Sequence, residues 1–376
     1  MSRRRGTTAS ERPPSRIAII QGAVPPYRTP LFEELRLALG DQLVIACGEV
    51  HFEQSVKSDP STEVVDIVLE NVFVLRRRLL YQRGFRKATV GANTIVLELN
   101  PRVINTWLIL IESKLRGRRT VLWGHHLGRR LAETHPRLMR RFQVHLCGAL
   151  LAYTDDDASQ MRAQYPNKPV FVAPNATERR HDTAIVGQLT RTDFLYVGRL
   201  TEGKRPGLLL SGFASARNAG LIPAETRMLF VGEGPLKIGL IREAQRLAVA
   251  DRVIFMDGTF DSKKLNDLYA SAVAGVCGGY VGLNITQSLS RGVPFIYPAV
   301  ANHSPEVALA RPGFNAFTFD PPDAASAIAT ALADTWSTSS RGRIDHEAIR
   351  EAAVSRYSIE SMTAGYLEAL RGGSDA

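Results

Sequence analysis

The chain has 376 residues, 44% of them hydrophobic and 22% charged, a composition that excludes a disordered or fibrous protein and a length that exceeds one ordinary hydrophobic core. Its three cysteines lie far apart and form no CxxC pair, which argues against a zinc site or a disulfide framework and favours a reducing cytoplasm. No apolar run approaches the roughly 20 residues that cross a bilayer, and none follows the basic residues 1–15 as a signal peptide requires. We expect a disordered tail at 1–15 and two folded domains after it.

The formal net charge of +10 is distributed unevenly. Residues 71–145 hold 16 Lys and Arg residues against three glutamates, a balance of +13, while the rest of the chain sums to −3. This asymmetry predicts one strongly positive surface that suits an anionic membrane, a pyrophosphate-linked acceptor or nucleic acid. Nucleic acid is the least favoured partner because no binding module and no stripe of interleaved basic and aromatic residues is recognisable.

Short apolar runs alternate with helix-length amphipathic stretches along the whole chain. The strands predicted in the first half are Arg16–Ile20, Gln42–Ala46, Thr94–Leu97, Thr120–Trp123 and Ala149–Tyr153, and a helix is expected over Pro30–Leu39. Those predicted in the second half are Asp193–Val197, Arg227–Val231, Arg252–Met256, Ala274–Cys277, Pro294–Tyr297 and Ala316–Phe319. Strands separated by helices are typical of a doubly wound parallel sheet. The sequence therefore predicts two Rossmann-like α/β domains.

The boundary between these domains is predicted within 170–177, where a short strand ends in a Pro-Asn turn before a polar stretch. The first domain then covers 16–174 and the second covers 175–354. An amphipathic helix within 355–372 belongs to either domain, and one possibility is that it crosses back to the first.

One helix in the basic region has two interpretations. Thr134 suits its N-cap, Pro136 suits its first turn, and Leu138, Phe142 and Leu146 follow at a spacing of four. A neighbouring stripe consists of Arg137, Arg140 and Arg141. Such a helix suits docking on an anionic membrane surface. The alternative is an ordinary surface helix whose apolar side packs on its own sheet.

A phosphate site is predicted after the strand that ends at Val197. Gly198 lets the backbone approach a phosphate closely, and the helix that follows adds oriented N–H groups. Arg199 can grip two phosphate oxygens, and Lys204 adds a mobile point charge. These residues suit a diphosphate, whereas the alternative is a solvated surface turn. The next strand ends in a second turn, LFVGEGP, whose Gly232 lies at the same end of the same sheet.

The segment CGGYVGLNITQSLSRGVPFIYP, residues 277–298, breaks a buried strand into a glycine loop, a helix and the next strand. It resembles the donor-binding segment of retaining glycosyltransferases of family 4, which reads EGFGLPxLEAMAxGxPVI. This resemblance implies the GT-B fold, two Rossmann-like domains that face each other across a cleft, and a nucleoside-diphosphate sugar as donor. Positions that match include Gly282, Leu283, Leu289, Gly292, Val293 and Pro294.

Both glutamates of the family motif are replaced. Gln287 stands where the ribose-binding glutamate is expected, and its amide can still hydrogen-bond hydroxyl groups. Gly279 stands at the other position and has no side chain. The resemblance then leaves the sugar to Tyr280 or to backbone N–H groups of the loop from Gly282 through Leu283 to Asn284.

Other segments extend the resemblance along the second half. VGRLTEGK resembles the family's phosphate-binding loop, and SPEVALARPGFNAF resembles its E-x-V stretch, with Glu306 as the matching acid. Within IFMDGTF, the resemblance implies that Gly258, Thr259 and Phe260 flank the nucleobase.

Acceptor contacts are predicted from the first half. A turn after the opening strand presents Pro26, Tyr27 and Arg28 to the expected cleft. His125 and His126 follow a strand at the same edge, and the resemblance implies that one of them binds the transferred sugar or the acceptor. The alternative for this pair is a structural role.

The resemblance implies transfer of a sugar to an acceptor hydroxyl with retention at the anomeric carbon. Arg199 and Lys204 would stabilise the departing diphosphate, so no metal or other cofactor is expected. The acidic run Asp155–Asp157 is interpreted as a helix start, not a metal motif. A lipid-linked or saccharide acceptor, polysaccharide or glycolipid synthesis and the inner face of a membrane fit the basic region. A nucleotide-sugar epimerase with the same fold and a catalytically degenerate binding protein remain alternatives.

Overall fold

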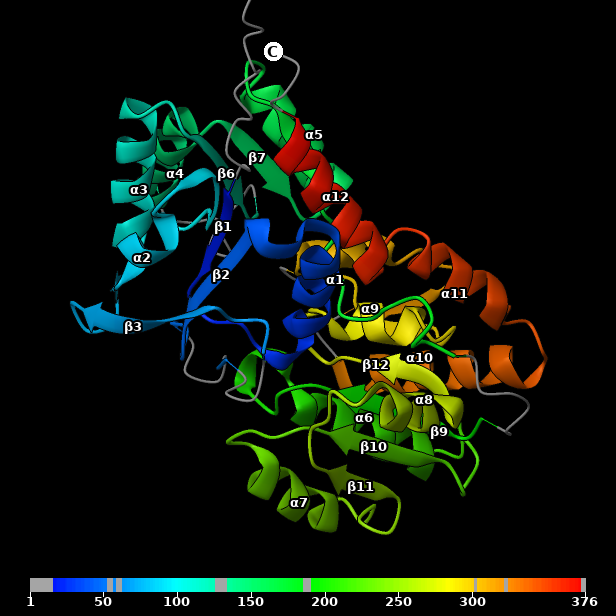
Figure 1. The fold of residues 1–376 in the computed structure, drawn as a ribbon. Coiled ribbons are helices and arrows are strands. Elements are labelled where there is room, and N and C mark those ends of the chain that lie inside the picture. Colours follow the sequence, from blue (N-terminus) through cyan, green and yellow to red (C-terminus); the bar gives the residue numbers. More distant parts are fainter. Residues whose placement is uncertain are drawn as a thin grey trace, which may run out of the picture. The chain divides into compact units, whose positions relative to one another are not determined.

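The computed structural model describes residues 16–52, 57–58, 63–125, 134–184, 191–300, 303–320 and 324–372. The chain forms two compact units (Figure 1). The first comprises residues 1–124, 134–150 and 369–376, and the second comprises residues 125–133 and 151–368.

The first sheet has the strand order β4-β3-β2-β1-β5-β6-β7-β8. Its strands are β1 (Arg16–Gln21), β2 (Leu43–Gly48), β3 (Ile67–Val74), β4 (Leu79–Arg83), β5 (Ala92–Glu98), β6 (Arg119–Trp123), β7 (Ala149–Ala152) and β8 (Val170–Val172). β1 pairs in parallel with β2 and β5, and every residue of β2 is buried. Strands buried on both faces explain why the sequence shows continuous apolar runs here. All five strands predicted in the first half are confirmed.

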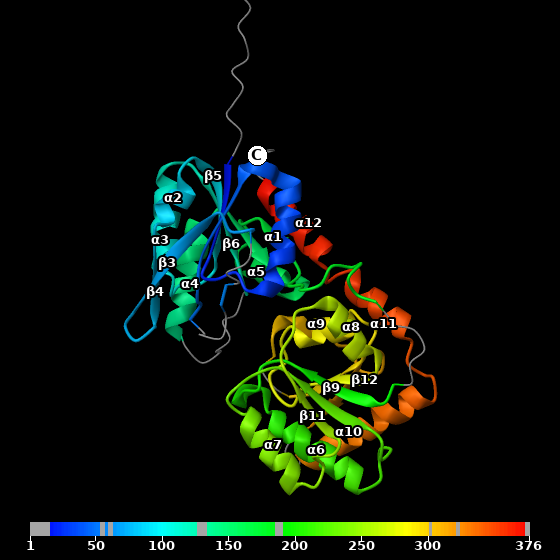
Figure 2. The same ribbon diagram turned by 60° about the horizontal axis from the view of Figure 1, so that its bottom comes forward.

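Helices cover both faces of this sheet. They are α1 (Thr29–Leu39), α2 (Phe85–Thr89), α3 (Ile104–Leu115) and α4 (Thr134–Leu146), with short 3₁₀ turns η1 (Pro26–Arg28) and η2 (Gly40–Gln42) beside α1. Figures 1 and 2 show α1 on one face and α2, α3 and α4 together on the other. α1, the predicted helix, buries Leu31, Phe32 and Leu35 as a single apolar stripe.

The hairpin of β3 and β4 departs from the parallel pattern that the sequence predicts. β4 runs antiparallel to β3, with Glu70 opposite Arg83 and Val74 opposite Leu79. Its turn places Leu75, Arg76 and Arg77 at positive φ, a region that favours glycine or asparagine. The hairpin escaped prediction because its turn contains none of the residues that normally signal one.

The second sheet has the order β11-β10-β9-β12-β13-β14, and all its pairings are parallel. Its strands are β9 (Asp193–Val197), β10 (Arg227–Val231), β11 (Val253–Met256), β12 (Ala272–Val276), β13 (Phe295–Pro298) and β14 (Ala316–Phe319). Its helices are α6 (Pro206–Asn218), α7 (Lys237–Arg246), α8 (Ser262–Ala270), α9 (Asn284–Leu289), α10 (Ala324–Ser340) and α11 (His346–Val354), with 3₁₀ turns η3 (Glu202–Lys204) and η4 (Pro305–Leu309). The six strands predicted in the second half are confirmed, so this unit is a doubly wound parallel sheet. Two further helices are α5 (Asp155–Gln164), after β7, and α12 (Ile359–Arg371), at the end of the chain.

α4 is the helix for which the sequence left two interpretations. Leu138 is 54% exposed and Phe142 is 61% exposed, whereas Gln143 and Val144 on the opposite side are buried. The alternative in which the apolar stripe packs on its own sheet is therefore wrong for Leu138 and Phe142, whereas Leu146 is half-buried. The side chains of 134–137 lie outside the described residues. In the described part of the chain, no helix combines the length and the apolar character that a bilayer-crossing segment needs.

Candidate functional site

Glycine turns meet at the carboxyl edge of the second sheet. Gly198 follows β9 and donates its N–H to the Val231 carbonyl at 2.9 Å, and Gly232 follows β10 and donates to the Met256 carbonyl at 3.0 Å. A Cβ atom on Gly232 would overlap the carbonyl oxygen of Gly198, and one on Gly258 would lie 3.5 Å from the Gly232 Cα. Open parallel sheets bind ligands outside this edge. The structure thus brings together three of the glycines that the sequence singled out.

Lys204 lies against the glycine loop of residues 278–282. The Tyr280 N–H donates to the Gly203 carbonyl at 2.8 Å, and the Lys204 Nζ donates to the Tyr280 carbonyl at 2.7 Å. A Cβ on Gly282 would be only 3.2 Å from the same Nζ atom. The half-buried ammonium group is therefore held beside the loop that the sequence assigned to the donor. Arg199, at the start of the same turn, has an exposed side chain, and its carbonyl accepts a hydrogen bond from the Tyr196 hydroxyl at 2.6 Å.

Gly279 has no room for a side chain. Its Cβ would lie 2.5 Å from the Gly203 carbonyl oxygen and 3.1 Å from the Lys204 carbonyl carbon. Because these are backbone atoms, they cannot rotate away as a flexible side chain would. Any side chain at position 279 would therefore require the loop of residues 278–282 and the turn at 203–204 to move apart.

Replacing Gly279 with alanine should weaken donor binding and destabilise the fold by about 1–3 kcal/mol, the usual cost of overpacking. Gly203→Ala is the matched control. Gly203 is the residue whose carbonyl oxygen faces Gly279, yet a Cβ atom on Gly203 itself would meet nothing within 4 Å. Thermal denaturation and donor titration of both variants measure the difference. Equal behaviour of the two variants would contradict the tight contact.

The backbone N–H groups of the loop are already occupied at two positions. The Gly282 N–H donates to the Asn284 Oδ1 at 3.0 Å, and the Val281 N–H donates to the His303 Nδ1 at 3.1 Å. In this structure the Gly282 N–H is thus bonded to a side chain, and its predicted contact with the sugar stays a prediction. The side-chain amide nitrogen of Asn284 is a second candidate donor to a ligand. This buried Nδ2 atom has no hydrogen-bond partner among the described residues.

His303 was not predicted, yet it holds the glycine loop. Its Nδ1 accepts from Val281, its Nε2 lies 2.9 Å from the Pro298 carbonyl, and its ring packs edge-on against Tyr297. These contacts require the neutral ring with its proton on Nε2. Burial lowers the pKa of His303 from its usual value, and the positive charge of Lys204 lowers it further.

The stability of the second unit should fall as the pH drops below about 6.5, the usual histidine pKa. The unfolded chain binds a proton there before the folded His303 does, so the free energy of unfolding decreases until the pH passes the lowered folded pKa. A His303→Gln variant should lose part of this pH dependence in thermal denaturation. His346 shares the direction of shift and accounts for a remaining slope. An unchanged slope in the variant would exclude His303 as its source.

Gln287 lies on α9 with 8% of its surface exposed. Its carbonyl accepts hydrogen bonds from the Arg291 Nη1 at 3.1 Å and from the Ser290 hydroxyl at 3.1 Å. Its side-chain amide makes no hydrogen bond within the described part of the chain. The amide thus keeps its bonding capacity for a ligand.

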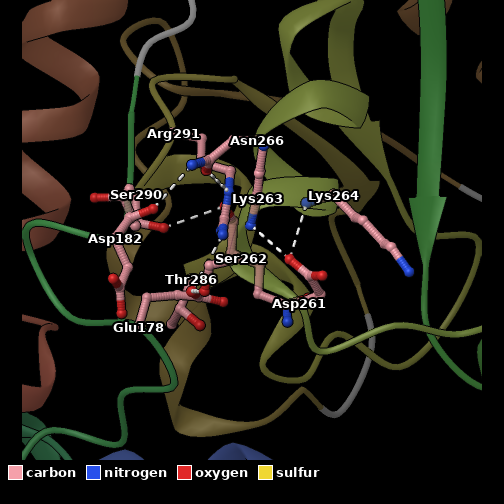
Figure 3. Close-up of polar contacts among 12 residues, drawn as sticks. Glu178, Asp182, Asp261, Ser262, Lys263, Lys264, Asn266, Thr286, Ser290 and Arg291 are labelled. Atoms are coloured by element: carbon pink, nitrogen blue, oxygen red, sulfur yellow. Dashed lines mark hydrogen bonds and ion pairs between the residues drawn. The ribbon is translucent and has the colours of Figure 1, made fainter.

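A buried ion pair anchors the helix that carries Gln287 (Figure 3). The Arg291 Nη2 lies 3.1 Å from the Glu178 Oε2, and the Arg291 side chain is wholly buried. Its Nε donates to the Asn266 Oδ1 at 2.7 Å, while the Ser262 hydroxyl donates to Glu178 at 3.0 Å. The network joins α8, the end of α9 and the segment around residue 178. Sequence reasoning missed it because its partners are far apart in the chain.

His125 belongs to the second unit and packs against α5. Its Nδ1 lies 3.5 Å from the Asp157 Oδ2, and its ring centroid lies 4.2 Å from that of Tyr153. Asp157 is also in the first turn of α5, where its N–H donates to the Thr154 cap at 3.1 Å. The acidic run thus starts a helix, as predicted, and one member contacts the histidine. His126 lies outside the described residues.

The predicted acceptor residues form the turn η1 after β1. Arg28 is buried, and its guanidinium lies 5.0 Å from the Trp123 ring centroid and 5.3 Å from that of Tyr27. Its packing is a cation–π contact within the unit. Pro26 and Tyr27 are half-buried and remain the more accessible members.

A hollow of about 630 Å³ lies beside the β3–β4 hairpin in the first unit. Its lining includes Glu49, Lys57, Glu70, Phe73 and Arg77. The Arg77 guanidinium stacks 3.6 Å over the Phe73 ring and donates to the His51 carbonyl at 3.0 Å. The volume falls in the range of small-molecule sites. This hollow could not be predicted from the sequence because it depends on the unpredicted hairpin of β3 and β4.

Residues 191–337 match the family model described as Glycosyl transferases group 1. No curated protein matches the chain in sequence. Among solved structures, Anabaena HepE in complex with UDP is 14% identical with a TM-score of 0.69, covering 95% of this chain and 100% of its own. A glycosyltransferase from Rickettsia africae is 11% identical with a TM-score of 0.70, covering 96% and 99%. Sucrose-phosphate synthase from Thermosynechococcus elongatus is 17% identical with a TM-score of 0.67, covering 95% and 98%.

The chain is a glycosyltransferase with the GT-B fold. The matched region of this glycosyltransferase contains the glycine turns, Lys204, the 278–282 loop and Gln287. The matched region also includes Arg291 and most of the other residues of the buried ion-pair network, whereas Glu178 precedes it in the sequence. The donor-side predictions therefore all fall within the region that the family model covers.

Proposed function

We propose that this glycosyltransferase moves a sugar from a nucleoside-diphosphate sugar to an acceptor hydroxyl. The observation that carries the proposal is the ammonium group of Lys204, held at 2.7 Å from the Tyr280 carbonyl beside the glycine turns of β9 and β10. A cation next to glycine turns suits a diphosphate leaving group, because a phosphate can come close to a backbone that has no side chains. HepE, which shares the fold, was solved with UDP and with UDP-glucose.

Each part of the donor has a proposed set of residues. The diphosphate contacts Gly198, Gly232, Arg199 and Lys204, whose charges replace a metal ion. The described residues contain no cluster of acidic, histidine or cysteine side chains that suits a metal.

The remaining donor contacts lie on the loops around this site. The base contacts Gly258, Thr259 and Phe260, and Phe260 is 58% exposed. Gln287 binds the ribose hydroxyls. The sugar contacts Tyr280 or the backbone N–H groups of the loop from Gly282 through Leu283 to Asn284. One of the two histidines, His125 or His126, completes this set.

We propose that the acceptor is a saccharide or a lipid-linked saccharide in polysaccharide or glycolipid synthesis at the cytoplasmic face of a membrane. The +13 balance of residues 71–145 supports a lipid-linked pyrophosphate. Pro26 and Tyr27, with Arg28 packed against the Tyr27 ring, offer polar and aromatic contacts for a sugar, and so do the residues that line the hollow beside the hairpin. The resemblance to family 4 supports retention at the anomeric carbon as part of this proposal.

Thermal denaturation against UDP-, GDP-, ADP- and dTDP-sugars tests the donor proposal, because a ligand that binds only the folded state raises its melting temperature. A shift by one nucleotide series is expected, and no shift with any of them would contradict a nucleotide-sugar site. Incubation of the bound donor with and without saccharide acceptors then separates transfer from the alternatives. An isomerised donor without acceptor would favour an epimerase, and an unconsumed donor would favour a binding protein.

Gln287→Glu should tighten binding of the donor found in that screen, since a carboxylate forms stronger, charge-assisted bonds to the ribose hydroxyls. Gln287→Ala should weaken it by about 0.5–1.5 kcal/mol, the usual worth of one hydrogen bond. Calorimetric titration of the donor with each variant measures the two changes. Equal affinities in all three proteins would show that residue 287 does not touch the ribose.

A further inference from the structure

Two neighbouring helices of the first unit expose large apolar side chains to solvent. On α4 these are Leu138 (54% exposed), Met139 (45%) and Phe142 (61%). On α3 they are Leu108 (42%), Ile111 (48%) and Leu115 (83%). The helices contact each other and lie on one face of the sheet (Figures 1 and 2). Several large apolar side chains exposed on two adjoining helices are typical of an interaction site.

The same two helices carry an excess of positive charge. α4 contains no carboxylate, and the only one on α3 is Glu112. Guanidinium groups surround it, with Arg86 at 3.5 Å, Arg116 at 2.6 Å and Arg118 at 3.1 Å. Lys114 and Arg141 add two exposed cations. We call the surface of α3 and α4 with these residues the α3–α4 face. Its described residues combine exposed apolar groups with more cations than its one carboxylate, Glu112, can balance.

We propose that the α3–α4 face docks the enzyme on an anionic lipid bilayer, with the Leu138 and Phe142 side chains inserted between headgroups and the surrounding cations on lipid phosphates. A surface helix with apolar and basic residues binds in this way, and each cation near an anionic leaflet adds to the affinity. Long Lys and Arg side chains can reach the lipid headgroups with their charged ends while the helix itself lies deeper, beside the acyl chains.

Two other occupants fit the face less well. A second copy of the chain in a symmetric dimer would place these cations opposite the same cations, which opposes association. Nucleic acid would match the charge but would leave six large apolar side chains against a highly polar surface. An anionic lipid surface matches both kinds of group, because its acyl chains accept the apolar side chains and its phosphates attract the cations.

This docking gives the proposed lipid-linked acceptor its location, and to that extent it rests on the proposed function. Its test does not, because binding to vesicles needs neither donor nor acceptor. The two proposals can therefore fail separately.

The experiment measures sedimentation of the full-length protein with phosphatidylcholine vesicles, with and without phosphatidylglycerol. We expect binding that requires phosphatidylglycerol and weakens as salt is raised. Leu138→Gln and Phe142→Gln should each lower the vesicle affinity by about tenfold or more, as expected for the loss of one buried apolar side chain. Lys114→Gln and Arg141→Gln should each lower it by about fivefold.

Ile238→Gln is the matched control. Ile238 is 67% exposed on α7, an amphipathic helix of the second unit that also carries basic residues. The variant therefore shows whether the loss of any exposed apolar side chain beside cations weakens vesicle binding. This variant should keep full vesicle binding. Melting temperatures equal to that of the wild type show that each variant is folded.

Several results would overturn the proposal. Equal binding to neutral and anionic vesicles, no binding to either, or an equal loss in Ile238→Gln and Phe142→Gln would do so. A wild-type dimer in light scattering that Phe142→Gln converts to a monomer would assign the face to a second copy. If the donor screen still succeeds in these cases, the proposed transfer stands without the membrane.

Discussion

Lys204→Ala should lower kcat by about 100- to 1,000-fold, corresponding to about 2–4 kcal/mol for the loss of one preorganised donor to a developing oxyanion. The ammonium group is fixed before the reaction by its hydrogen bond to the Tyr280 carbonyl, at 2.7 Å. It therefore needs no reorganisation as charge develops on the departing diphosphate. Donor binding should weaken less than turnover falls, because the charge it stabilises is largest in the transition state. Initial rates over a range of donor concentrations separate the two effects.

Arg199→Ala should act in the same direction, since its exposed guanidinium follows the phosphate-binding turn. Arg242→Ala on α7 is the control for loss of an exposed cation in the same unit. It should leave kcat unchanged. If Lys204→Ala retained wild-type kcat with an unchanged melting temperature, the proposed role of the ammonium group in diphosphate departure would be wrong.

The second sheet could be predicted from sequence because its signals are local. Each strand is a short apolar run, and Gly198 and Gly232 follow β9 and β10 immediately. Parallel strands bring their carboxyl ends to one edge, so topology alone places these two turns together. The close approach of Gly232 to the Gly198 carbonyl is the three-dimensional consequence of that pattern.

The unpredicted features depend on contacts between distant residues or on unusual backbone geometry. The β3–β4 turn uses Leu75, Arg76 and Arg77 at positive φ, so no turn residue marked it. His303 supports the glycine loop although it follows β13, and nothing in its local sequence indicates Val281 as its partner. The resemblance places Gly279 at a glutamate position of the family 4 motif, yet only the structure shows that the Gly203 carbonyl fills the space beside it.

The side chains of α4 show a different limit of sequence reasoning. Their spacing predicted a helix with an apolar stripe, but spacing alone does not say which stripe faces the sheet. Gln143 and Val144 occupy the buried side, so Leu138 and Phe142 face solvent. The polar residue Gln143 is buried while the apolar residues Leu138 and Phe142 are exposed. Hydrophobicity along the sequence does not predict this arrangement.

Glu178→Gln should destabilise the second unit by about 3–5 kcal/mol, because it leaves the guanidinium of Arg291 buried without its counter-charge. Arg291 is 1% exposed and its Nη2 lies 3.1 Å from the Glu178 carboxylate. Its other bonds, to the Asn266 side chain and the Gln287 carbonyl, are to neutral groups. Donor affinity should fall as well, since Arg291 fixes the end of the helix that carries Gln287. Chemical denaturation and donor titration measure the two effects.

Arg291→Met in the Glu178→Gln background tests whether the loss comes from the unpaired charge or from the missing contact. Removing both charges at similar volume should recover much of the stability, because the cost lies in the isolated ion. Donor affinity should not recover to the same extent, since methionine cannot bond the Gln287 carbonyl. Arg217→Ala removes half of the exposed Arg217–Asp251 pair and should change stability little. If the double variant were as unstable as Glu178→Gln, the geometry of the network and not its charge balance would hold α9 in place.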